Sequence, residues 1–416
     1  MPSPSCSVLL NRIVETLFPS QPEFRRNSEQ WEGGIIPKIT REELMEACKR
    51  VGNSKAPGLD GIPNIALKLA INTMPEHNEC LREGIFPAMW KQQRLVLLLK
   101  ANKPPDEPSS YRPLCMLDTA GKILERLIHQ RIDAAVEPAL VGNQYGFRKS
   151  RSTVDAINLA VETARKAIAG ERWLNGTKEY CLGVTLDIKN AFNSARWDCI
   201  MEAHARLNVL GYLQRMVSSY FSRRVLKYDT ETGPKKYKVT GGVPQGSVLD
   251  PLLWNIIYDG LLKLKLPQRT KLVAVADDVA VVIVRKHLED MKRVFSITFE
   301  KIRCWMDSVG LSLAEEKTEA VLITCRKKIE TITLQVRCCE ITSQPPIRYL
   351  QVMIRCATEL QAASGVRGSQ GIWCEIHLVM PYAKHRGTQA EKRSTFVFSD
   401  YFGPHIWGNV LQLQEA

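Results

Sequence analysis

The sequence lacks the patterns typical of zinc-binding, disulfide-stabilised and membrane-spanning proteins. Its twelve cysteines form no C-x-x-C pair and its seven histidines no H-E-x-x-H motif, so neither transition-metal chemistry nor a disulfide framework is predicted. No apolar run reaches the ~20 residues that a membrane helix needs. Met1–Pro19 carries no charged stretch followed by a sustained apolar one, which predicts the absence of a signal peptide. We therefore expect an intracellular, non-secreted protein with reduced thiols.

The charge balance favours a polyanionic partner. The 416 residues include 57 Lys and Arg against 44 Asp and Glu, a net charge of +13. Such an excess suits nucleic acid, although a surface that merely keeps the chain in solution remains the alternative. A hydrophobic content of 44% is ordinary for a globular protein, and the length allows two or three subdomains around a large core.

The most unusual stretch is Leu272–Val284, an apolar run interrupted by two adjacent carboxylates. Its β-branched residues predict a buried strand or a pair of strands, whereas Asp277 and Asp278 are expensive to bury unless a partner or a metal ion compensates them. One interpretation is a hairpin turn, which Asp tolerates well. The other is a metal site at the strand tips, and the two interpretations are compatible.

A third carboxylate follows another predicted strand. Cys181–Ile188 is apolar and carries Asp187 near its end. Oxygen ligands on a rigid sheet suit a pair of magnesium ions that activate a hydroxyl and neutralise a leaving pyrophosphate. Because neighbouring strand residues point to opposite faces, we expect Asp277 to be a direct ligand and Asp278 to lie behind it. These residues alone fit a two-metal nuclease equally well.

A basic segment precedes a predicted helix. In Gln144–Thr153, the cations Arg148, Lys149 and Arg151 are interleaved with aromatic residues, as in proteins that bind single-stranded nucleic acid. Cations at a helix N-terminus oppose its dipole, which indicates that something anionic compensates them. A solvated basic loop is the alternative.

The remaining pattern alternates between helices and strands. Residues 1–40 have little periodicity and are interpreted as a lead-in. Thr40 offers a capping start to a helix, and Asp118 is expected to cap another. Two predicted strands, Arg94–Lys100 and Tyr111–Leu117, flank a proline-rich basic loop. A glycine-containing loop, Gly241–Ser247, precedes a predicted helix.

Seven blocks, taken together, resemble the ordered motifs of a reverse transcriptase, specifically those of arthropod non-LTR retrotransposons. They are Lys55–Pro63, Tyr111–Leu117, Gln144–Thr153, Leu186–Trp197, Gly242–Leu253, Ala274–Val281 and Gly310–Ile323. The resemblance as a whole covers roughly residues 40–355, in order and without rearrangement. The resemblance implies an α/β (α+β) right-hand polymerase fold. It assigns residues 41–180 mainly to fingers, 181–355 mainly to palm and 356–416 to a diverged thumb remnant.

The resemblance also implies roles for individual residues. Asp187, Asp277 and Asp278 match the catalytic, metal-binding carboxylates. Lys317 matches the lysine proposed as general acid for pyrophosphate, with a solvated loop lysine as the alternative.

Further roles concern the nucleotide. Phe192 matches the aromatic that blocks a ribose 2′-OH, and Arg112 matches the cation facing the triphosphate. Gln245, followed by Gly246 in the Pro-Gln-Gly block, matches the residue lining the nucleotide and template pocket.

The implied activity is RNA-directed DNA polymerisation with two Mg²⁺ ions, or Mn²⁺ as a substitute. The implied partners are an RNA template, a DNA primer or target and deoxynucleoside triphosphates, without a membrane, in a ribonucleoprotein of the nucleus or cytoplasm. A catalytically impaired relic that only binds RNA is the alternative. A two-metal nuclease is disfavoured, because Phe192 and the Pro-Gln-Gly block have no role there.

Several positions depart from the family pattern. Val275 replaces an aromatic residue beside the primer end, and Asp250 and Gln351 replace glycines. We expect Val275 to impair activity without removing a metal ligand, and Asp250 to repel a triphosphate. Residues 72–80 are shortened relative to the pattern. After Ile354 the resemblance stops and returns only in fragments, which suggests a local slip of the coding frame; reading the genomic DNA in all frames tests this.

Overall fold

The structure, a computed structural model, describes residues 6–24, 36–54, 57–71, 76–169, 179–324, 330–337, 339–350, 352–357 and 375–379. The chain divides into two compact units, each assembled from three separate stretches. The first unit comprises Met1–Gly142, Lys189–Lys263 and Trp305–Ser312. The second comprises Asn143–Ile188, Leu264–Cys304 and Leu313–Ala416. Within the described residues, no helix is long and apolar enough to cross a membrane.

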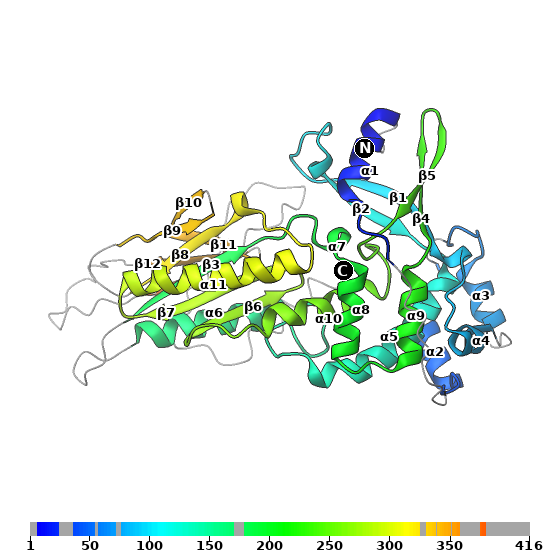
Figure 1. The fold of residues 1–416 in the computed structure, drawn as a ribbon, viewed down its shortest axis with the longest axis horizontal. Coiled ribbons are helices and arrows are strands. Elements are labelled where there is room, and N and C mark those ends of the chain that lie inside the picture. The colour runs from blue at the N-terminus through cyan, green and yellow to red at the C-terminus, as the bar shows by residue number, and fades with distance from the viewer. Residues whose placement is uncertain are drawn as a thin grey trace, which may run out of the picture. The chain divides into compact units, whose positions relative to one another are not determined.

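The first unit combines helices with one four-stranded sheet in the order β2-β1-β4-β5 (Figure 1). Its strands are β1 (Gln92–Leu99), β2 (Tyr111–Met116), β4 (Arg224–Thr230) and β5 (Gly233–Val239). Its helices are α1 (Ser7–Leu17), α2 (Arg41–Lys49), α3 (Asn64–Ile71), α4 (Glu76–Glu83), α5 (Thr119–Val136), α7 (Ala191–Ser194), α8 (Trp197–Arg206), α9 (Gly211–Phe221) and α10 (Asp250–Leu262). Short 3-10 turns lie at η1 (Met89–Lys91), η2 (Pro108–Ser110) and η3 (Glu137–Ala139).

Helix starts in the first unit show where local sequence signals hold. Thr40 caps α2 as predicted, in a reciprocal capping box with Glu43. Asp118 occupies the N-cap position of α5, but its side chain makes no capping bond and instead accepts from the backbone N–H of Asp60. The predicted helix start at Asp118 is therefore confirmed in position, but the side-chain capping bond is not formed, because a contact from a distant loop takes the carboxylate. Residues 7–17, expected to belong to a lead-in, form α1 with a buried apolar face.

The second unit is organised on an antiparallel sheet in the order β6-β7-β3-β8 (Figure 1). Its elements are α6 (Thr153–Ile168), β3 (Tyr180–Leu186), β6 (Thr270–Val275), β7 (Asp278–Arg285), most of α11 (Leu288–Ser308), the 3-10 turn η4 (Glu315–Lys317) and β8 (Glu319–Ile323). Smaller sheets pair β9 (Thr333–Val336) with β10 (Cys339–Thr342), and β11 (Pro346–Tyr349) with β12 (Val352–Ala357) and β13 (Glu375–Val379).

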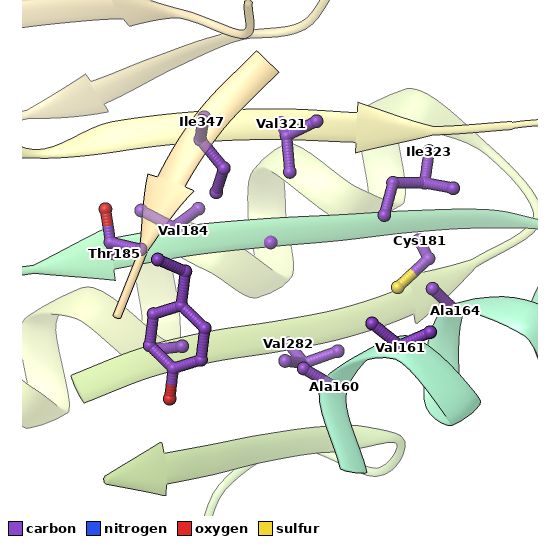
Figure 2. Close-up of a pocket in the computed structure, with 13 residues that line it drawn as sticks. Ala160, Val161, Ala164, Cys181, Val184, Thr185, Val282, Val321, Ile323 and Ile347 are labelled. Atoms are coloured by element: carbon purple, nitrogen blue, oxygen red, sulfur yellow. The ribbon is translucent and has the colours of Figure 1, made fainter. Parts of the chain in front are cut away.

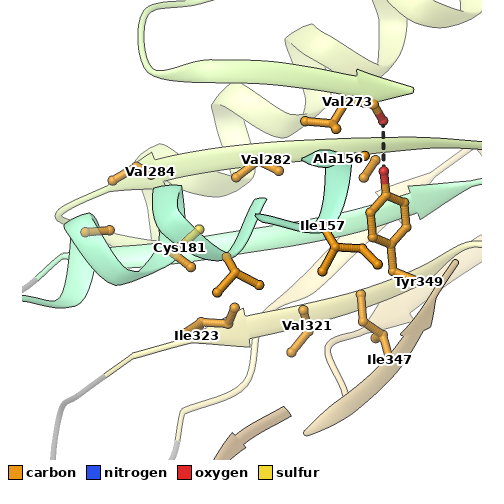
Figure 3. Close-up of a cluster of buried hydrophobic side chains, with 14 of the residues drawn as sticks. Ala156, Ile157, Cys181, Val273, Val282, Val284, Val321, Ile323, Ile347 and Tyr349 are labelled. Atoms are coloured by element: carbon orange, nitrogen blue, oxygen red, sulfur yellow. Dashed lines mark hydrogen bonds between the residues drawn. The ribbon is translucent and has the colours of Figure 1, made fainter. Parts of the chain in front are cut away.

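One face of this sheet is sealed by α6 and by β11. Alternate apolar residues of β3, β7 and β8 pack against Ile157, Val161 and Ala164 of α6, as Figure 3 shows in part. Tyr349 lies in the same cluster and donates its hydroxyl hydrogen to the carbonyl oxygen of Val273 at 3.2 Å. A small apolar cavity of about 30 Å³ remains beside Gly183 in the middle of β3 (Figure 2). The packed face fixes the register of the strands that carry the acidic residues.

The mixed helix and sheet class predicted from the sequence is confirmed. The predicted strands around the basic loop form the β1–β2 hairpin, and Leu272–Val284 forms the β6–β7 hairpin. The division at residues 180 and 355 stays a prediction, since the compact units are discontinuous in sequence. Lys55, Ala56, Gln351 and most of the expected thumb remnant (358–374 and 380–416) lie outside the described residues.

Candidate active site

The strand register of the second unit brings Asp187 and Asp278 to the same end of two neighbouring strands. β3 and β7 are antiparallel, with Leu186 opposite Val279. Asp187 follows Leu186 and Asp278 precedes Val279, so one further step of the register sets the two carboxylates opposite each other on one face of the sheet. Two sequence positions 91 residues apart therefore meet because the buried strands admit only this register.

Asp277 lies in the tight turn between β6 and β7. Val275 pairs with Asp278, which leaves Ala276 and Asp277 as the connecting residues. Ala276 has a φ of 57°, the left-handed conformation that such two-residue turns require. Both interpretations of the Asp pair are thus compatible, since a hairpin turn presents it at the strand tip. The expectation that Asp277 is the direct ligand stays a prediction, while Asp278 is the residue in register with Asp187.

The three carboxylates influence one another electrostatically. Although Asp278 is exposed, the pKa of its carboxyl is raised to about 6, first by partial desolvation and then by the negative charges of Asp277 and Asp187. The positive charge of Lys317 lowers the pKa of Asp278. Negative charge is therefore concentrated at this strand end, and Lys317 offsets only part of its effect on Asp278.

Lys317 lies at this carboxylate cluster. Its Nζ is 2.6 Å from Oδ2 of Asp187. The approach is fixed through the backbone, because the N–H of Ala314 donates to the carbonyl oxygen of Asp187 at 2.8 Å and Ile188 bridges to Leu313. Lys317 is the last residue of the turn η4, which follows directly after this backbone contact. Lys317 is exposed to solvent and ion-paired with Asp187, and its role as a general acid stays a prediction.

The donor set fits a hard divalent cation. The three carboxylates offer only oxygen ligands, and a cation among them would relieve the repulsion that, after partial desolvation, helps to raise the pKa of Asp278. In the described part of the chain, no three His, Cys, Asp or Glu side chains are already gathered at ligating distances. Asp187 is instead paired with Lys317, so a cation would have to share or displace that ammonium.

The predicted nucleic-acid loop begins at a buried glutamine. Gln144 is 4% exposed, and its side chain contacts the backbone of Ala276 in the Asp-Asp turn. Sequence reasoning missed this contact, although a polar residue in a motif block was the available signal. Gly146 follows, and a Cβ there would lie 2.3 Å from the backbone nitrogen of Ala276. Only glycine therefore allows the loop to pass so close to the turn.

The three cations of this loop lie in the second unit, before α6. The Arg151 guanidinium lies 5.6 Å from the centre of the Tyr145 ring, a cation–π geometry. The anionic compensation expected at this helix start is supplied within the chain, because Ser152 and Asp155 form a capping box. Phosphate contact by Arg148, Lys149 and Arg151 stays a prediction, and one argument for it is removed.

Phe192 belongs to the first unit, on the single turn α7. Its ring lies 4.9 Å from that of the fully buried Trp254, centre to centre. Its carbonyl oxygen accepts from the N–H of Val243 at 2.8 Å. Gly242 makes this approach possible, because a Cβ there would meet the backbone of Asn193 at 2.6 Å. Phe192 is thereby tied to the loop that leads to Gln245.

Gln245 and Gly246 form the next turn of that loop and lie against β2. The N–H of Cys115 donates to the carbonyl oxygen of Gln245 at 2.8 Å. Gly246 has a φ of 108°, and a Cβ would lie 2.9 Å from the carbonyl oxygen of Cys115. The Pro-Gln-Gly block therefore depends on glycine for both backbone conformation and space.

A buried carboxylate accepts a hydrogen bond from the backbone that follows this loop. Glu125 is 1% exposed and accepts from the N–H of Val248 at 2.6 Å. Tyr220 donates its hydroxyl hydrogen to Ser247 Oγ at 2.9 Å. Sequence reasoning missed Glu125, although a charge within the apolar stripe of a predicted helix was the signal.

Asp250, expected to stand beside the substrate loop, is 7% exposed in the first turn of α10. Burial raises the pKa of the Tyr220 and Cys115 side chains, and the negative charge of Asp250 raises it further. The positive charge of Arg224 lowers the pKa of both groups. An acidic residue in the first turn also suits the helix dipole. Its burial indicates a structural role inside the first unit, where Arg224 supplies a nearby opposite charge.

Arg112 lies on a basic face of the first unit's sheet. Arg94 pairs with Lys227, and Lys227 pairs with Lys236, so three cations form a row across adjacent strands. Met116 pairs with Arg94, which sets Arg112, four residues earlier on the same strand, on the same face. Arg94 is also ion-paired with Asp229 at 2.7 Å. We call Arg94, Arg112, Lys227 and Lys236 the basic face.

The structure thus collects the predicted residues into two groups. Asp187, Asp277, Asp278, Lys317 and the basic loop belong to the second unit, and Arg112, Phe192, Gln245 and Gly246 belong to the first.

Comparison with known proteins identifies the relatives of this arrangement. Residues 100–354 match the family described as reverse transcriptase (RNA-dependent DNA polymerase). The chain is 32% identical to the 115 kDa protein of the type-1 retrotransposable element R1DM of Drosophila melanogaster, over 70% of this chain and 28% of that protein. It is 27% identical to the RNA-directed DNA polymerase from the mobile element jockey of the same species, over 70% of this chain and 32% of that protein.

A third relative is the Pol polyprotein of the R1 element of Bradysia coprophila, 28% identical over 76% of this chain and 31% of that protein. The chain spans about three tenths of the length of these relatives. Among solved structures, apo telomerase from Candida tropicalis matches with a TM-score of 0.47 and 11% identity, over 65% of this chain and 54% of that one. A likeness of that size adds nothing to the family match.

Proposed function

This chain belongs to the reverse transcriptase (RNA-dependent DNA polymerase) family, and from that premise we propose that it is the polymerase core of a non-LTR retrotransposon protein. The proposed reaction adds deoxynucleotides to a DNA primer or target, as directed by an RNA template. The observation that carries the proposal is the strand register that sets Asp187 opposite Asp278. Asp277 lies in the adjoining turn, and Lys317 is ion-paired with Asp187.

The residues divide the work of nucleotidyl transfer. Asp187, Asp277 and Asp278 would hold two Mg²⁺ ions, or Mn²⁺ in their place, which supply neutralisation of charge on the triphosphate and a lower pKa for the attacking 3′-hydroxyl. Lys317 would donate a proton to the departing pyrophosphate. Phe192 would exclude a 2′-hydroxyl, Gln245 and Gly246 would line the nucleotide pocket, and Arg112 would contact the triphosphate.

The basic face supports an RNA template as partner. Its row of cations spans three strands, a spacing that suits successive phosphates of a polyanion. We expect the variants Lys227→Gln and Lys236→Gln each to lower the slope of log affinity against log salt by about 1 for a single-stranded RNA. Lys292→Gln, a surface lysine on α11 paired with Glu289, is the matched control and should leave the slope unchanged. A slope that all three variants leave unchanged contradicts phosphate contact at this face.

We further propose that the chain acts inside the cell, in the nucleus or cytoplasm, as part of a ribonucleoprotein. The eight cysteines whose side chains the structure describes form no disulfide with one another, which is consistent with a reducing compartment.

The direct test is primer extension on an RNA template with four deoxynucleotides and Mg²⁺. We expect products whose length and sequence the template dictates. Shortening of the primer or of the RNA under the same conditions would identify a two-metal nuclease instead.

A second candidate, an impaired relic that only binds RNA, is favoured by Val275. This residue stands where the resemblance implies an aromatic, and, like Tyr145, it packs partly buried against the apolar cluster of the second unit. If the native chain binds RNA but extends no primer, while Val275→Phe restores extension, the relic is the correct description. RNA affinity that stays salt-sensitive in Asp187→Ala would show that binding is independent of catalysis.

A further inference from the structure

The Asp-Asp turn is held by one side chain from a distant part of the sequence. Gln144 Oε1 accepts from the N–H of Ala276 at 3.1 Å, and Gln144 Nε2 donates to the carbonyl oxygen of Ala276 at 3.1 Å. One carboxamide therefore satisfies both backbone groups of the residue that precedes Asp277. Such a two-point contact fixes orientation as well as distance.

The glutamine is itself fixed in place. Oε1 of Gln144 also accepts from the N–H of Gly146 at 2.9 Å. The flanking backbone pairs with β6, because the N–H of Tyr145 donates to Ala274 at 2.8 Å and the N–H of Ala274 donates to Asn143 at 2.9 Å. At 4% exposure, Gln144 has no room for another rotamer without leaving buried polar groups unsatisfied.

The turn needs such a support. Ala276 has a positive φ, which costs a residue with a Cβ about 1 kcal/mol or more, so the conformation persists only where surrounding contacts impose it. The turn also carries Asp277 and starts the strand at Asp278, two carboxylates that repel each other. Without the clamp, the turn would relax toward a conformation that spreads these charges.

We propose that Gln144 is a positioning residue, whose carboxamide holds the Ala276 turn so that Asp277 and Asp278 converge on one cation. The inference rests on the proposed function for its catalytic consequence, but the clamp itself is a property of the second unit. The side chain of Gln144 acts through the backbone groups of Ala276 and Gly146, to which it is hydrogen-bonded.

The first measurement does not require polymerase activity. In Gln144→Leu, a near-isosteric change, we expect the Ala276 and Gly146 amides to lose protection from hydrogen exchange. The Ala274 amide, bonded to the backbone of Asn143, should keep its protection. The affinity for Mn²⁺, followed by electron paramagnetic resonance, should fall about tenfold.

Polymerase kinetics provide the second measurement. For Gln144→Leu we expect kcat to fall about tenfold to a hundredfold, because a displacement of about 1 Å at the reacting centre has an effect of that size. The KM for deoxynucleotide should stay within about twofold, since the nucleotide contacts are elsewhere. Gln144→Glu keeps an oxygen that accepts from both N–H groups but sets a second, charged oxygen against the carbonyl oxygen of Ala276, so it should not retain the rate of the native chain.

The matched control is Glu179→Gln. Glu179 is ion-paired with Arg269 at the opposite end of the same hairpin, so this change weakens the sheet without touching the turn. It should lower thermal stability with unchanged Mn²⁺ affinity and kcat. If Gln144→Leu weakens Mn²⁺ binding no more than Glu179→Gln does, the positioning role is wrong. A native chain that binds Mn²⁺ but extends no primer would overturn the proposed function and leave the clamp to be judged by exchange and metal affinity.

Discussion

The ammonium group of Lys317 lies 2.6 Å from the carboxylate of Asp187, with 62% of the lysine side chain exposed to solvent. The pair joins the end of β3 to the turn η4, and the backbone bond between Ala314 and Asp187 holds the two segments in the same relation. An exposed ion pair contributes little to stability. Its significance is therefore chemical, because it keeps a proton donor beside a carboxylate of the candidate active site.

The pair leads to a prediction about proton transfer. Lys317→Met should reduce the single-turnover rate of nucleotide addition by about a hundredfold or more at saturating nucleotide, the size typical of a lost general acid. Thermal stability should change little, since the side chain is exposed. Lys317→Arg keeps the charge with a weaker acid and should remain slow. A rate for Lys317→Met within threefold of the native chain would leave Lys317 with no part in catalysis.

Phe192 predicts sugar selection. Its ring is held by Trp254 at 4.9 Å between centres, so it cannot turn aside easily when a 2′-hydroxyl approaches. Phe192→Val should raise the efficiency of ribonucleotide relative to deoxynucleotide incorporation by about tenfold to a hundredfold, through removal of the clash. Phe192→Tyr keeps the ring and is the control, with selection unchanged. Equal selection by the valine and tyrosine variants contradicts the assignment.

The cavity beside Gly183 predicts a stabilising substitution. A Cβ at Gly183 would meet only Val321 Cγ1, at 3.3 Å, and Val321 borders the same cavity of about 30 Å³, into which it can shift. Gly183→Ala should stabilise the folded protein by about 1 kcal/mol, because it buries a methyl group and makes the unfolded chain less flexible. Thermal and urea unfolding measure the change.

Gly146→Ala provides the contrast to Gly183→Ala. Its Cβ would lie 2.3 Å from a backbone nitrogen, so this variant should be destabilised. If both alanine variants unfold at the same denaturant concentration, the packing around β3 differs from that described.

His204 predicts a loss of stability in mild acid. It is fully buried, and burial lowers the pKa of its imidazole from 6.5 to about 4. A lowered pKa in the folded state means that the unfolded chain binds the proton first. Stability is therefore complete above pH 6.5 and falls as the pH drops toward 4, by at most about 3 kcal/mol.

His204→Gln tests the origin of this acid sensitivity. Glutamine retains a donor for the carbonyl oxygen of Ile200 but cannot take up a proton, so stability between pH 6.5 and 4 should vary less than in the native chain. The free energy of unfolding at several pH values measures the difference. An unaltered pH dependence in His204→Gln assigns the effect to other groups.

The sequence predicts the elements of this site better than the contacts that support it. The β6–β7 hairpin and the strand before Asp187 follow from short apolar runs around acidic residues, which are local signals. The roles of Phe192, Gln245 and Lys317 follow from resemblance to the family. By contrast, Gln144 and Ala276 are 132 positions apart, and no local pattern records their pairing.

Tertiary contacts also override local chemistry at two other positions. Asp118 has the sequence of a helix cap, but its carboxylate binds the N–H of Asp60. Asp250 replaces a glycine that the resemblance implied, and the expectation that it repels a triphosphate stays a prediction. Its burial in α10 near the Arg224 charge shows an internal environment that only the folded chain creates.

The proposed reaction depends on the carboxylates at the ends of β3 and β7, and single-nucleotide addition tests their role directly. Single-nucleotide addition to a DNA primer on an RNA template, with Mg²⁺, should be measured for the native chain and for Asp187→Asn and Asp278→Asn. We expect both variants to lose at least about a thousandfold in rate, because the charges that hold the cations are removed, with RNA affinity unchanged. Addition by either variant within tenfold of the native rate would contradict a catalytic role for these two carboxylates.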